Sequence, residues 1–298
     1  FEDKEPTEPT ERKLTDLELS HIESIISRED AQNSDELIKD ILSLVDCFEK
    51  DQVSSKEMNK MIKCLHKVIG KKEVLSWMKT SGYKPILMSI IKYFNMSANI
   101  TKELCFKGLI VFKELVVLNT LFGNLLSLTE TVAIWNILVM VIENLKNFKN
   151  EIYIAADEIV DEILELNLVN GKSTIRNSCY ALLKEGETNN TPLTSFLMLT
   201  LIKCIEHESL SFDQIKEIDN IVYKYLTSDE VEVRRLTIIT YSKCKNKLQL
   251  IDSNSIQKNI NGKLKVETMD ENREQDTLNF FDKLSTSQKK LVDYYSNA

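Results

Sequence analysis

The sequence predicts an all-α fold built as an α-solenoid of stacked helix pairs, and three observations support this. Two helical segments separated by a short polar turn recur about every 40 residues along the middle of the chain. The chain has only 7 glycines in 298 residues, whereas average usage of ~7% would give about 20. Its four prolines lie in a polar tail or near predicted helix starts: Pro6, Pro9, Pro85 and Pro192.

Four repeating units are expected, covering residues 83–119, 128–167, 168–209 and 211–248. One helix pair cannot bury its apolar face alone, so equal units at this period must stack on their neighbours, as HEAT-like repeats do. Such an architecture offers an extended binding surface. It does not by itself provide a catalytic cleft.

The sequence before these units divides into two parts. Residues 1–13 contain acids, bases and prolines with no large aliphatic side chain, so they are expected to form a flexible tail. Residues 14–82 have helical periodicity and are expected to form an N-terminal helical extension. The repeat domain itself is expected to span residues 83–298.

The C-terminal end of the chain is predicted to hold a loop and a capping helix. Residues 252–277 lose helical periodicity and are rich in Asn, Asp, Glu and Lys, which favours a flexible loop. A last helix, from about Thr286 to Tyr295, is expected to cap the solenoid. Leu291, Tyr294 and Tyr295 are predicted to dock it on the preceding repeat.

Composition argues against several classes of protein. A net charge of −8 disfavours general nucleic-acid binding, which needs clustered Lys and Arg. The densest apolar run, residues 132–142, is about half the ~20 residues that a membrane span requires. The six cysteines are far apart and fall mostly among apolar helix positions, which is typical of buried thiols in a reducing compartment such as the cytosol or nucleus.

No residues typical of catalysis, cofactor binding or metal binding stand together. His21, His66 and His207 share no motif. The string NGKST at 170–174 lacks the earlier glycine of a phosphate-binding loop, so we interpret it as a helix end followed by an N-cap at Ser173. Thr191, just before Pro192, is expected to be another N-cap. The sequence therefore predicts a protein that is not an enzyme.

The helix expected from Ser55 to about Ile69 has two distinct sides. Apolar residues fall on one side, and Lys60, Lys63 and Lys67 lie in a narrow stripe opposite. This stripe is either a solvated helix face or a docking face for an acidic protein. Trp77 lies shortly after it with Lys79 close by, as interface anchors often do, although core packing is an equal alternative for Trp77.

Two central helices differ in character. Residues 131–148 are apolar nearly all round, which favours an inner helix covered by both neighbours, with Trp135 in the core. Residues 151–166 have an apolar seam and an outer side that carries six acids and no base. We expect that outer side to be strongly acidic.

The fourth unit, FDQIKEIDNIVYKYLTSDEVEVRRLTIITYSKC, resembles a HEAT unit whose second helix opens with a Val-Arg pair, here Val233 and Arg234. It is similar to the last repeat of the C-terminal TOG-like domain of CLASP proteins, which are microtubule rescue factors. The terminal KLSTSQKKLVDYY resembles the short helix that ends that domain. The resemblance extends from about Tyr83 to the C-terminus, and the Asn- and Lys-rich insertions suggest a fungal member of the budding-yeast type.

The resemblance implies a TOG-like paddle. TOG domains that bind tubulin do so through the turns inside each helix pair, and the corresponding turns here read FNMSAN, LKNFKNE and LTSDEVE. Only the second turn is basic and the third is acidic, so this edge should repel acidic tubulin more than it attracts it. The family instead implies docking to a kinetochore, spindle or plus-end adaptor protein, and self-association, at the mitotic spindle in the nucleus or cytoplasm.

These inferences give two expected protein-binding patches. One combines Trp77 with Lys60, Lys63 and Lys67, and the other contains Lys146 and Lys149. Arg234 is expected to support the last repeat by bonding neighbouring carbonyls, beside a structural Val233. Two alternatives stay open, namely direct tubulin binding through Lys146 and Lys149, and a generic HEAT-repeat scaffold such as a phosphatase or transport adaptor.

Overall fold

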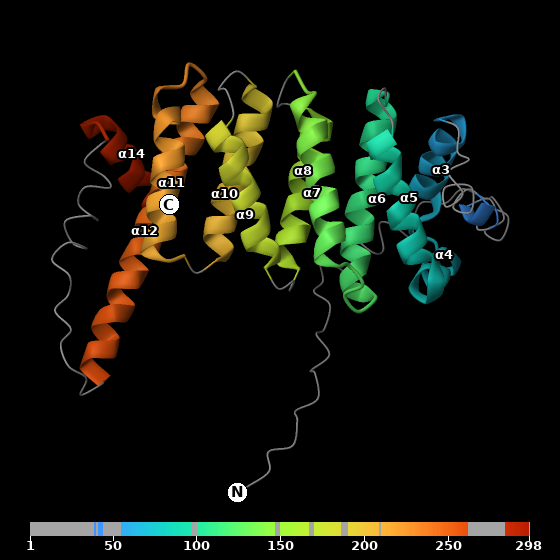
Figure 1. The fold of residues 1–298 in the computed structure, drawn as a ribbon, viewed down its shortest axis with the longest axis horizontal. Helices are drawn as coiled ribbons and strands as arrows, with labels where there is room; N and C mark the ends of the chain where they lie inside the picture. Colours follow the sequence, from blue (N-terminus) through green and yellow to red (C-terminus); the bar gives the residue numbers. More distant parts are fainter. Residues whose placement is uncertain are drawn as a thin grey trace, which may run out of the picture. The chain divides into compact units, whose positions relative to one another are not determined.

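The computed structural model describes residues 39, 41–43, 55–96, 100–146, 150–166, 170–185, 190–208, 210–261 and 284–297. Within these ranges all regular secondary structure is helical (Figure 1). This confirms the predicted all-α fold. The tail expected at residues 1–13, most of residues 14–54 and the site residue Lys149 lie outside the described ranges.

The chain divides into two compact units, Phe1–Glu114 and Leu115–Ala298. The first contains α3 (Ser55–Val68), α4 (Lys72–Trp77), the π-helical turn η1 (Met78–Gly82), α5 (Tyr83–Met96) and the first part of α6 (Lys102–Leu121). The division expected at residue 83 falls between η1 and α5, inside this unit. No break in the helical run from α4 to α5 occurs there.

Two glycines allow close packing in the first unit. A Cβ atom at Gly108 would lie 2.7 Å from the Phe94 ring, so only glycine lets α6 approach α5 this closely. Phe94 in turn stacks on Phe112, with the ring centroids 5.3 Å apart. A Cβ atom at Gly82 would lie 2.7 Å from the Trp77 indole, which therefore rests on the backbone of η1.

The second unit contains three helix pairs, which lie side by side in Figure 1. Their helices are α7 (Leu128–Glu143) with α8 (Glu151–Glu165), α9 (Gly171–Glu185) with α10 (Thr191–His207), and α11 (Phe212–Val222) with α12 (Val231–Asn261). A 3-10 turn, η2 (Tyr223–Thr227), links the last pair, and α14 (Thr286–Ser296) follows. Together with α5 and α6, these pairs match the four units predicted from the sequence.

Helix starts are fixed by side-chain caps, and two of them differ from the prediction. Asn190, and not Thr191, caps α10, because its side chain accepts a hydrogen bond from Leu193 N at 3.1 Å. Helix α9 already begins at Gly171, so Ser173 lies inside it. The Ser173 hydroxyl donates back to Asn170 O at 3.1 Å, and Asn170 adopts a left-handed φ of 63°.

Helix α10 is the most enclosed helix described in the second unit, since α7, α8, α9 and α12 all pack against it. Phe196 of α10 stacks on Trp135 of α7 with the ring centroids 5.7 Å apart. The Trp135 indole nitrogen donates to Ser178 Oγ at 2.8 Å. Trp135 is therefore a core residue, as predicted.

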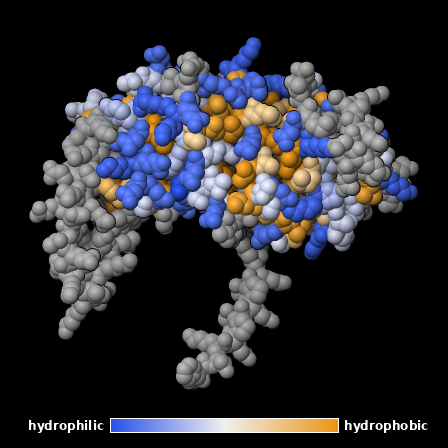
Figure 2. All heavy atoms as spheres, in the orientation of Figure 1, coloured by the Kyte–Doolittle hydropathy of each residue, from blue (hydrophilic) through white to orange (hydrophobic). Residues whose placement is uncertain are grey.

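Residues 131–148 were predicted to form an inner helix covered by both neighbouring helices. This prediction is only partly correct. Val132, Val139 and Met140 of α7 are only half-buried. Figure 2 shows hydrophobic residues at the surface over α7, whereas hydrophilic residues dominate over α11 and α12. The inner helix is α10, whose Thr194, Ser195 and Thr200 are buried although they are polar.

The loop predicted at residues 252–277 is wrong for its first ten residues, because α12 runs on to Asn261. No glycine or proline interrupts residues 231–261, and Gly262 is the first residue that favours a helix end. Polar composition alone therefore misplaced the end of the helix. Residues 262–283 lie outside the described ranges.

Helix α14 packs on α12, as predicted for a capping helix. Of the three residues expected to dock it, only Tyr295 takes part, since it is half-buried and bonds to Arg235 of α12. Leu291 and Tyr294, which were expected to dock it, are 47% and 68% exposed. Val292 is buried instead, together with Leu284 just before the helix. On a helix of ~100° per residue, Leu291 lies about 100° and Tyr294 about 160° around the axis from Val292, so both point away from α12.

Burial also changes the acidity of core thiols and phenols. It raises the pKa of Cys105 to about 11 and that of Tyr93 to about 12 in the first unit. In the second unit it raises the pKa of Cys204 to about 12 and that of Tyr225 to about 12. These groups therefore stay protonated and unreactive at neutral pH.

We expect the free energy of unfolding to fall as the pH rises above about 9. Since the folded state holds the Cys105 proton more tightly than the unfolded chain does, its contribution is complete below pH 9 and is lost as the pH passes 11. Urea unfolding at pH 8 and pH 11 should show that Cys105→Ala reduces the loss by about 2 kcal/mol. The exposed and non-ionisable Ser76→Ala on α4 is the control and should leave the loss of unfolding free energy unchanged.

Candidate functional site

The lysine face predicted on α3 is present in the structure. Met61, Ile62 and Leu65 are fully buried, while Lys60, Lys63 and Lys67 are exposed on the helix. Lys63 also faces the start of α6, since it helps to lower the pKa of Glu103, after the larger effect of Lys107. We refer to Lys60, Lys63 and Lys67 as the α3 lysine face.

Trp77, the other predicted member of this patch, is half-buried at the end of α4. Its ring is held against Gly82, so one side of the indole is unavailable to a partner. The neighbouring Lys79 is exposed. Trp77 is therefore partly a packing residue, and only its exposed side can contribute to binding.

The turns inside the helix pairs share a repeated contact in the second unit. Helix ends leave backbone carbonyls without partners, and here the next pair supplies the donors. Asn190 Nδ2 donates to Glu143 O at the end of α7, at 2.9 Å. The Tyr225 hydroxyl donates to Leu183 O at 2.7 Å, and Lys224 Nζ donates to Lys184 O at 3.2 Å, both at the end of α9.

These turns form one edge of the second unit, which we call the turn edge. Lys146, the described member of the second predicted patch, is exposed just after α7. The turn between α11 and α12 presents Tyr223 and Val231, which are 46% and 69% exposed, beside the exposed acids Asp229 and Glu230. The turn edge is thus mixed in charge and partly apolar.

The Val-Arg pair at the start of α12, Val233 and Arg234, packs in the core and bonds the backbone of the preceding turn. Val233 is 2% exposed and lies in the core. The Arg234 guanidinium donates to Ser228 O and so ties the α11–α12 turn to the helix. Both side chains therefore hold the turn edge in place.

Sequence reasoning did not single out Tyr223, Lys224, Val231 or Ile154. Ile154 is 56% exposed on α8, between acidic residues. In the sequence, Ile154 is an apolar residue outside the stripe of 3.6-residue period that packs in the core, and this indicates an exposed apolar side chain. Val231, at the start of α12, has the same pattern. Lys224 could not be recognised, because its partner carbonyl lies 40 residues earlier.

The acidic side of α8 is partly neutralised from the next pair. Lys203 of α10 lies 2.7 Å from a carboxylate oxygen of Asp157 and 2.7 Å from one of Asp161. Burial raises the pKa of Asp157, an effect that its bond to Lys203 partly offsets. The acidic outer side predicted from the sequence is therefore also a contact that stacks α10 on α8.

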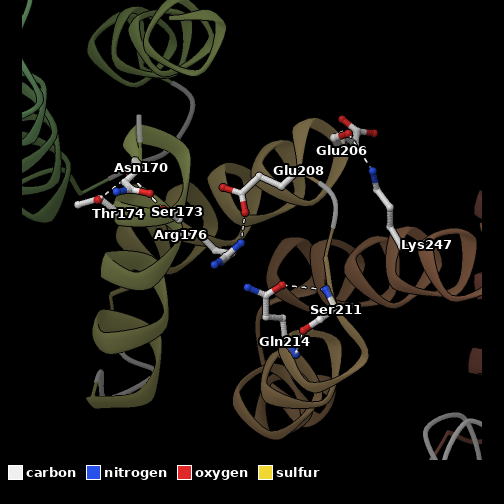
Figure 3. A network of polar contacts seen from close by, with 9 residues as sticks. All are labelled: Asn170, Ser173, Thr174, Arg176, Glu206, Glu208, Ser211, Gln214 and Lys247. Carbon is white, nitrogen blue, oxygen red and sulfur yellow. Dashed lines mark hydrogen bonds and ion pairs between the residues drawn. The ribbon is translucent and has the colours of Figure 1, made fainter. Parts of the chain in front are cut away.

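A polar network lies around the start of α9, the end of α10 and the start of α11 (Figure 3). The Arg176 guanidinium forms an ion pair with Glu208, and the two side chains are only 7% and 12% exposed. The guanidinium also lies 5.8 Å from the centroid of the Tyr180 ring. Arg176 Nε, Glu208 Oε1 and the Tyr180 hydroxyl have no hydrogen-bond partner among the described residues.

This buried pair fixes the turn between α10 and α11. Ser211 caps α11 in a capping box with Gln214, and Lys247 of α12 donates to Glu206 O at 3.1 Å. In Figure 3 these two contacts lie on either side of the turn after Glu208, while Arg176 alone is drawn bonded to Glu208. Each of these contacts joins or caps a helix end, which is a structural role.

In the part of the chain that the structure describes, no group of three or more His, Cys, Asp and Glu side chains is arranged to hold a metal ion. Among the described helices, none is both long and apolar enough to cross a lipid bilayer.

The first unit thus presents the α3 lysine face, and the helix pairs of the second unit present a turn edge of mixed charge. The chain is similar to Protein STU1 of Debaryomyces hansenii. The two are 28% identical over 284 residues, which is 92% of this chain and 17% of that protein. STU1 is a CLASP-family protein, so the match supports the CLASP-like relationship that the sequence resemblance implied. No protein-family model and no solved structure matches this chain.

Breaking the Arg176–Glu208 pair should destabilise the second unit strongly. Arg176→Met leaves the buried Glu208 charge uncompensated, and loss of one partner of such a pair typically costs about 3–5 kcal/mol. The double variant Arg176→Met/Glu208→Gln should lose less, because no buried charge remains alone. The measurement is urea unfolding followed by circular dichroism.

The matched control for this experiment is Arg235→Met. Arg235 forms a partly exposed pair with Glu232 on α12 and also bonds to Tyr295 of α14. Solvent-exposed pairs of this kind contribute about 0–1 kcal/mol. Equal losses for Arg176→Met and Arg235→Met would contradict a buried structural pair.

Proposed function

We propose that the chain is a non-catalytic protein-interaction domain of a CLASP-type microtubule-associated protein of the budding-yeast type. It docks a kinetochore, spindle or plus-end adaptor protein at the mitotic spindle and forms a homodimer. The observation that carries this proposal is the similarity to STU1 over 92% of the chain. The stacked helix pairs support it, because they provide extended faces for partners.

The α3 lysine face is the proposed docking surface. It presents ammonium groups at Lys60, Lys63 and Lys67 on one side of a helix whose other side is buried. The chain as a whole has a net charge of −8, so this face is a local positive surface on an acidic protein. It suits an acidic segment of the partner, which also contacts the exposed side of Trp77.

We expect a fluorescent fusion of the whole chain, expressed in budding yeast, to concentrate at spindle or kinetochore foci. The triple variant Lys60→Glu/Lys63→Glu/Lys67→Glu should reduce the focal signal several-fold, because it replaces attraction for an acidic partner by repulsion. The measurement is the focal fraction of fluorescence during mitosis.

The control for localisation reverses three other lysines, in Lys172→Glu/Lys184→Glu/Lys216→Glu on α9 and α11. It makes the same change in net charge and should keep the focal signal. A diffuse signal for the unchanged chain would overturn the proposed function. Equal loss in both triple variants would remove the α3 lysine face as the docking surface.

Direct tubulin binding is the second candidate, and one observation favours it. The turn edge carries the exposed Lys146 and Lys224 together with the exposed Tyr223. Bases and an aromatic residue at such turns are what the resemblance to TOG domains implies for tubulin binding. Asp229 and Glu230 on the same edge oppose it, because tubulin is acidic.

Size-exclusion chromatography with purified tubulin at low salt separates the two candidates. The proposed function predicts separate elution. Co-elution that Lys146→Glu/Lys149→Glu/Lys224→Glu abolishes, and that Lys172→Glu/Lys184→Glu/Lys216→Glu does not, would favour direct tubulin binding instead.

A further inference from the structure

An open hollow of about 540 Å³ lies along one side of α5 in the first unit. Its apolar lining comes from Pro85, Met88 and Ile91, and Met88 is 51% exposed. The Ser89 hydroxyl, which also lines the hollow, donates to Pro85 O at 2.8 Å and so has no donor left for a ligand. A lone exposed apolar side chain is ordinary, but Met88 lies in a concave apolar surface. We call this hollow the α5 groove.

Lysines lie on both sides of Met88 in the α5 groove. Lys84 and Lys92 also line it, one helical turn before and one turn after Met88, so they are roughly 12 Å apart along the helix axis. An amphipathic helix binds such a groove through its apolar side. Lysines beside that side favour acids at its margin and disfavour bases. The α5 groove therefore fits an acidic amphipathic helix.

Residues 14–27, LTDLELSHIESIIS, lie outside the described ranges but have this pattern in the sequence. They contain three acids and no Lys or Arg. Two of the acids, Asp16 and Glu23, fall at the margin of the apolar side, roughly 10 Å apart along a helix, which is close to the separation of the two lysines. At ~100° per residue the apolar residues fall on one side: Leu14, Leu17, Leu19, Ile22, Ile25 and Ile26.

The segment is also tethered close to the α5 groove. Ile41 is fully buried and belongs to the same unit as α5. Residues 28–40, which join the segment to Ile41, can span about 40 Å, whereas α5 itself is only about 21 Å long. A short tether gives a local concentration on the order of millimolar. The chain's own segment is thus favoured over an acidic helix of a separate protein.

We propose that residues 14–27 bind as an amphipathic helix in the α5 groove of their own chain, with Asp16 and Glu23 beside Lys84 and Lys92. The bound segment covers Met88 and keeps the groove from acidic helices of other proteins. This inference goes beyond the proposed function, which assigns no role to these residues or to the groove.

Photocrosslinking in the purified full chain tests the proposal directly. Met88 is replaced by the photoreactive p-benzoylphenylalanine, and the crosslinked peptides are identified by mass spectrometry. An equal mixture of ¹⁵N-labelled and unlabelled chains separates crosslinks within one chain from crosslinks between copies. We expect the main crosslink to join position 88 to residues 14–27 of the same chain. The same replacement at Ser76, which is exposed on α4 and does not line the groove, should give several-fold less.

Charge reversal tests the pairing of acids and lysines. Asp16→Lys/Glu23→Lys should lower the crosslink from position 88 several-fold, because it places like charges together. Adding Lys84→Glu/Lys92→Glu to that variant should restore the crosslink. The control Glu29→Lys/Asp30→Lys makes the same change in net charge outside the segment and should leave the crosslink unchanged.

Several results would overturn the proposal. Crosslinks between labelled and unlabelled chains would show that a second copy occupies the groove. Crosslinks to other parts of the same chain, or no excess over the Ser76 position, would show that residues 14–27 do not bind there and would leave the groove to a separate partner. An undiminished crosslink in Asp16→Lys/Glu23→Lys would contradict the pairing with Lys84 and Lys92.

Discussion

The second unit depends on one constraint, which is that a single helix pair leaves an apolar side that only the next pair can cover. Helix α10 shows this most clearly, because four helices surround it and Phe196 meets rings from both helices of the preceding pair. Burial of this apolar surface supplies most of the favourable free energy. The bonds from Asn190 and Tyr225 to the helix ends of the preceding pair then fix where each pair sits.

Much of this fold could be predicted from local sequence alone. The 40-residue recurrence and the scarcity of glycine identified the paired helices from α5 to α12, because both reflect short-range geometry. Asn190 and Thr191 are both acceptable N-caps by residue type, with Asn the better of the two. The observed hydrogen bond from Leu193 N decides for Asn190. The length of α12 was underestimated because polar composition was taken for the absence of a helix.

The interaction surfaces were less predictable, since they depend on contacts between residues far apart in the sequence. The α3 lysine face follows from helical spacing and was therefore found. Arg176 and Glu208 are 32 positions apart, and Lys203 meets Asp157 across 46 positions, so neither contact leaves a local signal. In α14, Leu291 and Tyr294 were assigned to the docking side, whereas packing on α12 buries Val292 and leaves both of them exposed.

Native-state hydrogen exchange on the whole chain tests the stacking of the second unit most directly. If consecutive pairs stabilise one another, amides of α10 exchange slowest, and the protection of α9, α10 and α11 is lost together as denaturant is added. The account would be contradicted if α10 exchanged as fast as α14, or if α9 and α10 kept their protection after α11 and α12 had lost theirs.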